Sequence, residues 1–279
     1  MSAAAQDCYA MINGLRLHYR QWGLASRPAL LLLHASGCHA HWWNDVGLLL
    51  AETYHVLALD LRGHGESQHA QPPDYSFDAY VADIISFVDT LNLQRLAIIG
   101  HSMGGYIGLQ YASTQPAALR ALVVADMLCE MGGDMLERLH QASSRPQPTF
   151  ATRDEAVQRF RLQPPETTAS PDVLRALAEN AVCQTPEGHW TFRFDRRAMR
   201  HTAVRVWDLL PQVICPALVV RGELSPLMPA TNAEQVAQAL PHGEWTTVTG
   251  AYHNLMLDNL HDFVKVVGDF LARTDLRRD

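Results

Sequence analysis

The sequence has few cysteines, no long hydrophobic run and no block of like charges, and each absence excludes a class of protein. Its five cysteines are scattered through 279 residues and never occur in a Cys-x-x-Cys spacing, which argues against a zinc site and fits a reducing cytoplasm. No apolar stretch approaches the length of a transmembrane helix. The first residues show no basic region followed by an apolar run, so we expect no signal peptide and a cytoplasmic protein.

Charged clusters and repeats are also missing. The net charge of -7 is spread without a run of one sign, so we expect neither nucleic acid nor a membrane as a partner. The chain contains no internal repeat and no low-complexity tract. What it does contain is 48% hydrophobic residues, which is enough for one large domain or for a domain with an insertion.

Short apolar runs alternate with helical patterns along most of the chain. Apolar runs typical of strands buried on both faces occur at 29–33, 54–59, 96–99, 119–125 and 217–220, and residues 244–248 indicate a further strand. Helical spacing occurs at 42–50, 78–91, 106–116, 232–240 and 260–273. Before them, residues 9–20 indicate two strands joined at the turn signal Asn13-Gly14. This alternation predicts an α/β fold, with a mostly parallel central sheet and helices on both faces.

The alternation is interrupted between residues 127 and 205. This stretch carries several prolines, is rich in arginine and lacks any buried-strand run. Helical patterns occur near 134–142, 153–162 and 172–182. We therefore predict a helical cap at 127–205 over one edge of the sheet, inserted into a core formed by residues 1–126 and 206–279.

One stretch combines a buried strand, a glycine-flanked serine and a helix. Gly100-His-Ser102-Met-Gly104 directly follows the apolar run at 96–99. This is the context of a nucleophile elbow, a sharp turn that exposes a reactive serine at the edge of a sheet. Gly100 and Gly104 lack side chains where the chain passes close to itself. We predict Ser102 as a nucleophile, with the amide of Met103 donating toward the group that Ser102 attacks.

A serine nucleophile needs a base to take its proton. His253 follows the last predicted strand, which fits the chain order serine, acid, histidine of this architecture. His101 is adjacent to Ser102, and neighbouring residues on such a turn point apart. We therefore predict His253 as the base and give His101 a packing or pocket role.

The acid that would orient His253 is ambiguous in the sequence. Its usual place is the loop after the strand at 217–220, but Ser225 and Pro226 stand there, and neither can serve as the acid. The alternative place is the end of the strand that follows the elbow, where Asp126 lies. We predict Asp126 as the acid and keep Glu223 as the alternative.

An oxyanion hole needs a second donor besides Met103. The loop after the strand at 29–33 provides small residues, Ala35, Ser36 and Gly37, which allow the backbone to approach a substrate. The amide of Ser36 is the simplest choice for this donor.

Taken together, these motifs resemble the α/β-hydrolase family over nearly the whole chain. The resemblance rests on five stretches: His34-Ala-Ser-Gly37, Asp60-Leu-Arg-Gly-His-Gly-Glu-Ser67, Gly100-His-Ser-Met-Gly-Gly105, Arg221-Gly-Glu-Leu-Ser225 and Gly250-Ala-Tyr-His253. It implies the α/β-hydrolase fold, and some members carry the acid where Asp126 lies. Ala35 departs from the family pattern, in which glycine is commoner at that position.

The nucleophile narrows the activities that the resemblance implies. Dehalogenases and epoxide hydrolases of this family attack with aspartate, whereas Ser102 indicates acyl transfer through an acyl-enzyme. We expect a serine hydrolase that cleaves a small-molecule carboxylic ester or lactone, with no metal and no cofactor. The alternatives are a carbon–carbon bond hydrolase, a cofactor-free dioxygenase in which His253 and Asp126 act as a base pair, and a ligand receptor with a slow triad.

Apolar residues around the predicted site indicate a fairly apolar acyl or alcohol group in the substrate. The predicted pocket residues are His101, Ala35, Trp43 and Met127. Aromatic residues of the predicted cap, such as Phe150, Phe160, Trp190 and Phe192, would contribute to the same specificity. We expect either a monomer or a homodimer.

Overall fold

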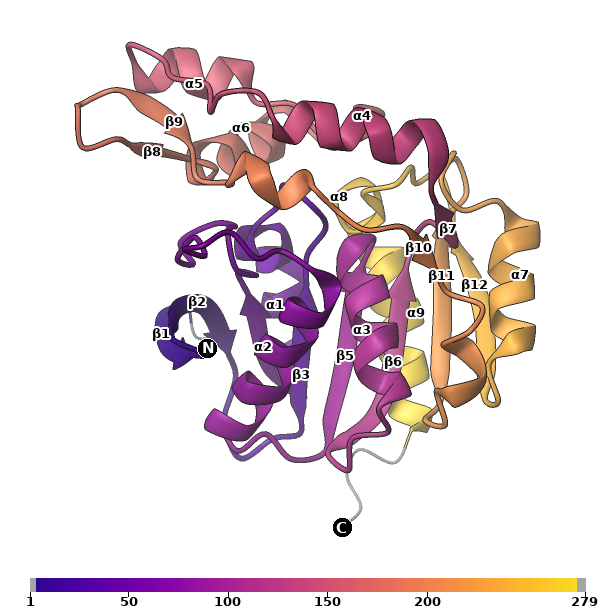
Figure 1. The fold of residues 1–279 in the computed structure, drawn as a ribbon. Helices are drawn as coiled ribbons and strands as arrows, with labels where there is room; N and C mark the ends of the chain where they lie inside the picture. The colour runs from indigo at the N-terminus through magenta and orange to yellow at the C-terminus, as the bar shows by residue number, and fades with distance from the viewer. Residues whose placement is uncertain (1–3, 275–279) are drawn as a thin grey trace.

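A computed structural model describes residues 4–274, and in this range an eight-stranded sheet has the strand order β1-β2-β4-β3-β5-β6-β11-β12 (Figure 1). The strands are β1 (Gln6–Ile12), β2 (Leu15–Trp22), β3 (Ala29–Leu33), β4 (His55–Leu59), β5 (Leu96–His101), β6 (Leu119–Ala125), β11 (Ala217–Gly222) and β12 (Gly243–Val248). β2 pairs antiparallel with β1 and β4, and all other neighbours in this sheet are parallel. The predicted mostly parallel sheet is confirmed.

The first two strands form the predicted hairpin. Ile12 pairs with Leu15 across a two-residue turn, in which Asn13 and Gly14 have φ angles of 49° and 79°. Two consecutive positive φ angles are typical of a type I′ turn, which matches the right-handed twist of the flanking strands. The Asn-Gly pair therefore located this turn correctly.

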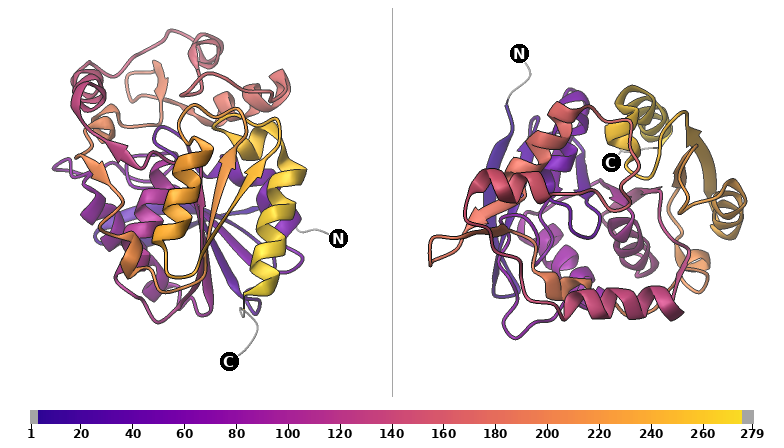
Figure 2. Two further views of the ribbon diagram at one scale, coloured as in Figure 1. Left: turned by 90° about the vertical axis from the view of Figure 1, so that its right-hand side faces the viewer. Right: turned by 90° about the horizontal axis from the view of Figure 1, so that it is seen from above.

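Helices cover both faces of the sheet (Figures 1 and 2). The helices α2 (Phe77–Thr90), α3 (Met103–Ser113) and α7 (Ala230–Ala239) cover one face, whereas α1 (Asn44–Leu50) and α9 (Leu260–Arg273) cover the other. Shorter turns are η1 (Ala40–Trp43), η3 (Leu210–Gln212) and α8 (Leu255–Asp258). Because both faces are covered, every residue of β3 and β5 is buried. Nowhere in residues 4–274 is a helix both long and apolar enough to cross a membrane.

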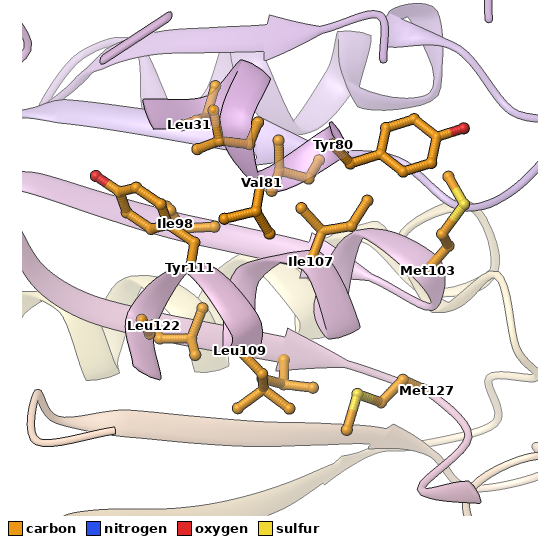
Figure 3. Close-up of a cluster of buried hydrophobic side chains, with 14 of the residues drawn as sticks. Leu31, Tyr80, Val81, Ile98, Met103, Ile107, Leu109, Tyr111, Leu122 and Met127 are labelled. Carbon is orange, nitrogen blue, oxygen red and sulfur yellow. The ribbon is translucent and has the colours of Figure 1, made fainter. Parts of the chain in front are cut away.

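Each face of the sheet has its own hydrophobic core. On the face covered by α2 and α3, side chains from three strands meet side chains from the two helices (Figure 3). The residues labelled in this cluster are Leu31, Tyr80, Val81, Ile98, Met103, Ile107, Leu109, Tyr111, Leu122 and Met127. Burying one such side chain contributes about 1.5–3 kcal/mol. This packing fixes the carboxyl ends of the strands, where the predicted site residues lie.

The chain leaves the sheet after β6 and returns to it at β11. Most of the intervening residues lie over the carboxyl ends of the strands (Figures 1 and 2). The elements are β7 (Glu130–Met131), α4 (Gly133–Ser143), α5 (Arg153–Arg159), α6 (Pro171–Asn180), β8 (Val182–Gln184), β9 (Trp190–Phe192), η2 (Arg196–Met199) and β10 (Val204–Arg205). The three predicted helices are present, but the four short strands were not predicted. The division into a core and a cap at 127 and 205 stays a prediction.

A buried carboxylate fixes the loop that follows β4. Asp60 is 1% exposed and accepts hydrogen bonds from the amides of Ala40 (2.5 Å) and Glu66 (2.9 Å), with Nδ1 of His18 2.6 Å away. Only glycine fits at position 65, because a Cβ there would lie 2.2 Å from this carboxylate. Burial alone would raise the pKa of Asp60, but the hydrogen bond and charge of His18 outweigh it and hold the pKa well below its usual value. Asp60 therefore stays charged.

Candidate active site

Ser102 lies on a strained turn between β5 and α3. Its φ of 53° and ψ of -116° are values that residues with a side chain rarely adopt. A Cβ at Gly100 would lie 2.2 Å from the carbonyl oxygen of Gly104, and a Cβ at Gly104 would lie 2.3 Å from that of Leu33. Only glycine fits at these two positions. The turn therefore holds the half-buried Ser102 at the carboxyl end of β5.

His253 and Asp126 meet from two loops at the same edge of the sheet. Asp126 follows β6 and is fully buried, and His253 lies beyond β12 and is 2% exposed. Nδ1 of His253 lies 2.8 Å from Oδ1 of Asp126. Because an ionised carboxylate can only accept a hydrogen bond, the proton belongs on Nδ1, and Nε2 is left as the basic nitrogen.

The loop after β11 supplies two further donors to Asp126. The hydroxyl of Ser225 donates to Oδ1 at 2.6 Å, and the amide of Gly222 donates to Oδ2 at 2.8 Å. Ser225 stands where the sequence led us to look for an acid. Its hydroxyl cannot act as an acid, but it holds the carboxylate of Asp126, which follows the neighbouring strand β6.

Glu223, the alternative acid, is engaged elsewhere. Its Oε2 accepts a hydrogen bond of 2.7 Å from the amide of Gly250, at the start of the loop that leads to His253. Within the described residues no hydrogen bond or ion pair joins Glu223 to His253. The geometry thus favours Asp126 over Glu223 as the partner of His253.

His101 connects the turn of Ser102 to the loop of His253. Its Nε2 donates to the carbonyl oxygen of His253 at 2.9 Å, and the two rings are 4.6 Å apart between centroids. Burial holds the pKa of His101 well below its ordinary value, so the ring is neutral. This contact agrees with the packing role predicted for His101.

The predicted oxyanion donors are amides on two adjoining segments. Met103 is the first residue of α3, so its amide has no partner within the helix. Ser36 follows Ala35 in a turn closed by a 3.1 Å hydrogen bond from the amide of Cys38 to the carbonyl of Ala35, which leaves the Ser36 amide outside the turn's own bond. The close approach of Gly104 to the end of β3 brings the two segments side by side.

The buried side chain of His34 holds residues 34–38, called the oxyanion loop below after their predicted role, against the loop after β4. Nε2 of His34 accepts from the amide of Leu61 at 3.1 Å, which places the proton on Nδ1. Nδ1 then donates to the carbonyl of Ala35 at 2.8 Å. Burial lowers the pKa of His34, so the neutral ring can accept one bond and donate the other.

Two of the predicted pocket residues, Trp43 and Met127, lie in the hydrophobic cores. Trp43 is fully buried and packs on Phe263 of α9, with 6.3 Å between ring centroids. Met127 is 1% exposed and lies in the cluster of Figure 3, although it directly follows Asp126. Packing within the cores accounts for the burial of both side chains. Ala35 is also buried in a core, and it lies within the oxyanion loop.

Residues from the segment 127–205 reach the oxyanion loop and were missed in the sequence. Nε2 of His201 lies 3.4 Å from the hydroxyl of Ser36, and its ring stacks on Phe77 with centroids 5.5 Å apart. Burial lowers the pKa of His201 to about 4, so this side chain is neutral. Phe194 packs on His64, with 4.7 Å between ring centroids. No local pattern around His201 or Phe194 indicates these contacts.

Metal-ligating side chains are dispersed in this structure. Among residues 4–274 no group of three or more His, Cys, Asp or Glu side chains could hold a metal ion. All five cysteines are free thiols.

Comparison with known proteins identifies the family of this chain. Residues 30–266 match the family described as Alpha/beta hydrolase family. An uncharacterized protein of Mycobacterium tuberculosis is 27% identical over 290 residues, covering 96% of this chain and 81% of its own length. The 3-oxoadipate enol-lactonase 2 of Acinetobacter baylyi is 25% identical over 229 residues, covering 81% of this chain and 82% of its own.

A solved structure shares the fold at lower identity. The thioesterase domain from the curacin biosynthetic pathway superposes with a TM-score of 0.81 and 23% identity, covering 95% of this chain and 99% of that one. The likeness spans both the sheet and the segment above it, because nearly all of both chains is included.

Proposed function

The chain belongs to the alpha/beta hydrolase family, and we propose that it acts as a serine hydrolase on a carboxylic ester or a lactone. The observation that carries the proposal is the 2.8 Å contact between His253 and the buried Asp126, at the same sheet edge as the strained turn of Ser102. Strain of this kind concentrates at functional sites. The similarity to a lactonase supports the same class of chemistry.

In the proposed reaction the hydroxyl of Ser102 attacks the substrate carbonyl, while Nε2 of His253 takes its proton. Asp126 keeps the proton of the resting imidazole on Nδ1 and stabilises the imidazolium that forms. The alcohol leaves with the proton from His253. Water then attacks the acyl-enzyme by the same route, which regenerates Ser102.

The amides of Met103 and Ser36 would stabilise the negative charge on the substrate oxygen. Losing one such donor costs about 3–4 kcal/mol in well-studied enzymes. The hydrogen bonds of His34 support this role, since they hold the carbonyl of Ala35 and thereby the turn that carries Ser36.

The segment 127–205 is proposed as the cap that shapes the acyl or alcohol pocket. Two of its side chains, His201 and Phe194, pack beside the oxyanion loop and would contact a substrate held there. The neutral imidazole of His201 and the phenyl ring of Phe194 carry no charge, so they favour an apolar substituent next to the ester group of the substrate. The partial exposure of Ser102 provides access for the substrate.

The test is hydrolysis of p-nitrophenyl butyrate by the wild type and by Ser102→Ala. Removing the nucleophile should lower kcat/KM by about 10⁴-fold or more. Ser26→Ala is the matched control, because this serine is exposed and distant in sequence from Ser102, and the variant should retain wild-type activity. Equal hydrolysis by Ser102→Ala would refute the proposal. Weak ester turnover together with cleavage of a vinylogous diketone would reassign the site to carbon–carbon bond hydrolysis.

A further inference from the structure

A cleft of about 1060 Å³ lies between the segment 127–205 and the loop that joins β4 to α2. Neither Ser102 nor His253 lines it. Five arginines line it: Arg145, Arg193, Arg196, Arg197 and Arg200. These arginines do not simply reflect a basic protein, because the whole chain has a net charge of -7 and Lys265 is its single lysine.

Three of these arginines have no carboxylate partner. Arg196 donates to the carbonyl oxygens of Ala142 (3.0 Å) and Pro146 (3.4 Å). Arg145 and Arg200 are exposed, and their guanidinium groups contact no acceptor within residues 4–274. These positive charges are therefore not neutralised by the protein.

The other two arginines differ in how well they are paired. Arg197 forms a forked pair with Asp195, with contacts of 2.7 and 2.9 Å. Arg193 has one loose contact of 3.6 Å with Glu66, while its Nε is buried and has no hydrogen-bond partner among the described residues. A buried donor without an acceptor is costly, and an anionic ligand would satisfy it.

The acidic residues of the cleft are engaged by the protein itself. Asp195 is paired with Arg197 and accepts from the hydroxyl of Tyr75. Asp74 accepts the hydroxyl of Ser76 at 2.8 Å, and Glu66 accepts that of Tyr9 at 2.6 Å. These carboxylates therefore offset the arginines only in part.

We propose that this cleft binds a small molecule that carries a diphosphate group. Guanidinium groups bind phosphate oxygens in a forked geometry, and each phosphate group carries more negative charge than a carboxylate. The hydroxyl of Thr202 lines the same cleft and can donate to a phosphate oxygen, whereas those of Ser143 and Ser144 donate to the carbonyl of His140. Several unpaired arginines favour a multiply charged ligand over a single carboxylate.

This site is separate from the proposed catalytic centre. Arg200 and Thr202 line the cleft, while His201 between them turns to Ser36 and stacks on Phe77. The side chain of His201 therefore faces the oxyanion loop, while its two chain neighbours line the cleft. The proposal does not depend on ester hydrolysis.

The test is isothermal titration calorimetry with inorganic pyrophosphate and with adenosine diphosphate. Wild-type protein should bind one equivalent of at least one probe. The double variant Arg145→Gln/Arg200→Gln should bind it at least about tenfold more weakly, because a hydrogen bond to a charged group is worth about a factor of ten or more in affinity. Arg138→Gln, at an exposed arginine of α4 outside the cleft, is the matched control and should bind normally.

Binding of pyrophosphate alone identifies a free inorganic anion as the ligand, and tighter binding of adenosine diphosphate identifies a nucleotide. Either result supports a diphosphate site. Ser102→Ala should bind as the wild type does. The proposal is overturned if neither probe binds saturably, if the double variant binds as well as the wild type, if Ser102→Ala abolishes binding, or if citrate binds more tightly than both probes.

Discussion

The hydroxyl of Ser225 donates to Oδ1 of Asp126 at 2.6 Å, the same oxygen that faces His253. The two residues follow neighbouring parallel strands, β11 and β6, and the amide of Asp126 bonds to the carbonyl of Val220 at 2.8 Å. The proposed acid and the serine that supports it therefore come from adjacent strand ends.

Ser225→Ala should weaken both stability and catalysis. The substitution removes a donor from a fully buried carboxylate, and such bonds contribute about 1.5–3 kcal/mol. We expect unfolding at lower urea concentration, and kcat/KM for p-nitrophenyl butyrate reduced about tenfold. Ser225→Thr, which keeps the hydroxyl, is the control. Wild-type kinetics and stability in Ser225→Ala would show that the 2.6 Å contact is unimportant.

Asp126→Asn should abolish most of the activity, whereas Glu223→Gln should leave it within about twofold. An asparagine at 126 cannot stabilise an imidazolium and loses about 10⁴-fold in comparable triads. Glutamine at 223 can still accept the amide of Gly250 through its side-chain oxygen. The measurement is kcat/KM for the same ester with both purified variants. The reverse ranking would transfer the role of acid to Glu223.

The strands of the sheet could be predicted because their sequence is also the cause of their structure. A strand covered on both faces, such as β3, must be apolar at every position, and that run is visible without coordinates. The short strands β8 and β9 pair over only three residues each. Three residues have no measurable period, so these strands depend on the chain around them, including the bond from the amide of Phe150 to Trp190.

In the candidate site, too, some features could be predicted from local sequence, whereas others depend on contacts between distant residues. The roles proposed for Ser102 and His253 follow from local signals, a glycine-flanked turn and a position after the last strand. The support given by Ser225 depends on the pairing of β6 with β11, and the contact of His201 with Ser36 joins residues 165 positions apart. Such contacts exist only after the tertiary fold has formed, so no sequence window contains them.

Gly104→Ala should be severely destabilising, whereas Gly268→Ala should be mildly stabilising. The added Cβ at 104 would lie 2.3 Å from the backbone oxygen of Leu33, which cannot move without disturbing β3. We expect a loss of about 3 kcal/mol or more. At Gly268, in α9, no atom lies within 4 Å of the added Cβ, and alanine gains about 0.5–1 kcal/mol in a helix. Urea unfolding measures both changes, and equal stabilities would contradict the packing described for the turn.

The pair of His18 and Asp60 predicts how stability depends on pH. Nδ1 of His18 lies 2.6 Å from Asp60, and Nε2 lies 3.2 Å from Asp7, so both ring nitrogens face carboxylates. Burial would lower the pKa of His18, but the bond to Asp60 outweighs it and raises the pKa above its usual 6.5. Between these two values the folded protein holds a proton that the unfolded chain has released.

The contribution of this proton to stability is therefore complete below pH 6.5 and is lost as the pH rises through the raised pKa of His18. In His18→Gln this dependence should be missing, so the difference in free energy of unfolding from the wild type should shrink as the pH rises from about 6 to 9. Urea unfolding across this range measures it. Asp7→Asn, at a carboxylate that is 52% exposed, should change the curve less. A difference that grows with pH would mean that His18 is neutral in the folded protein at pH 6.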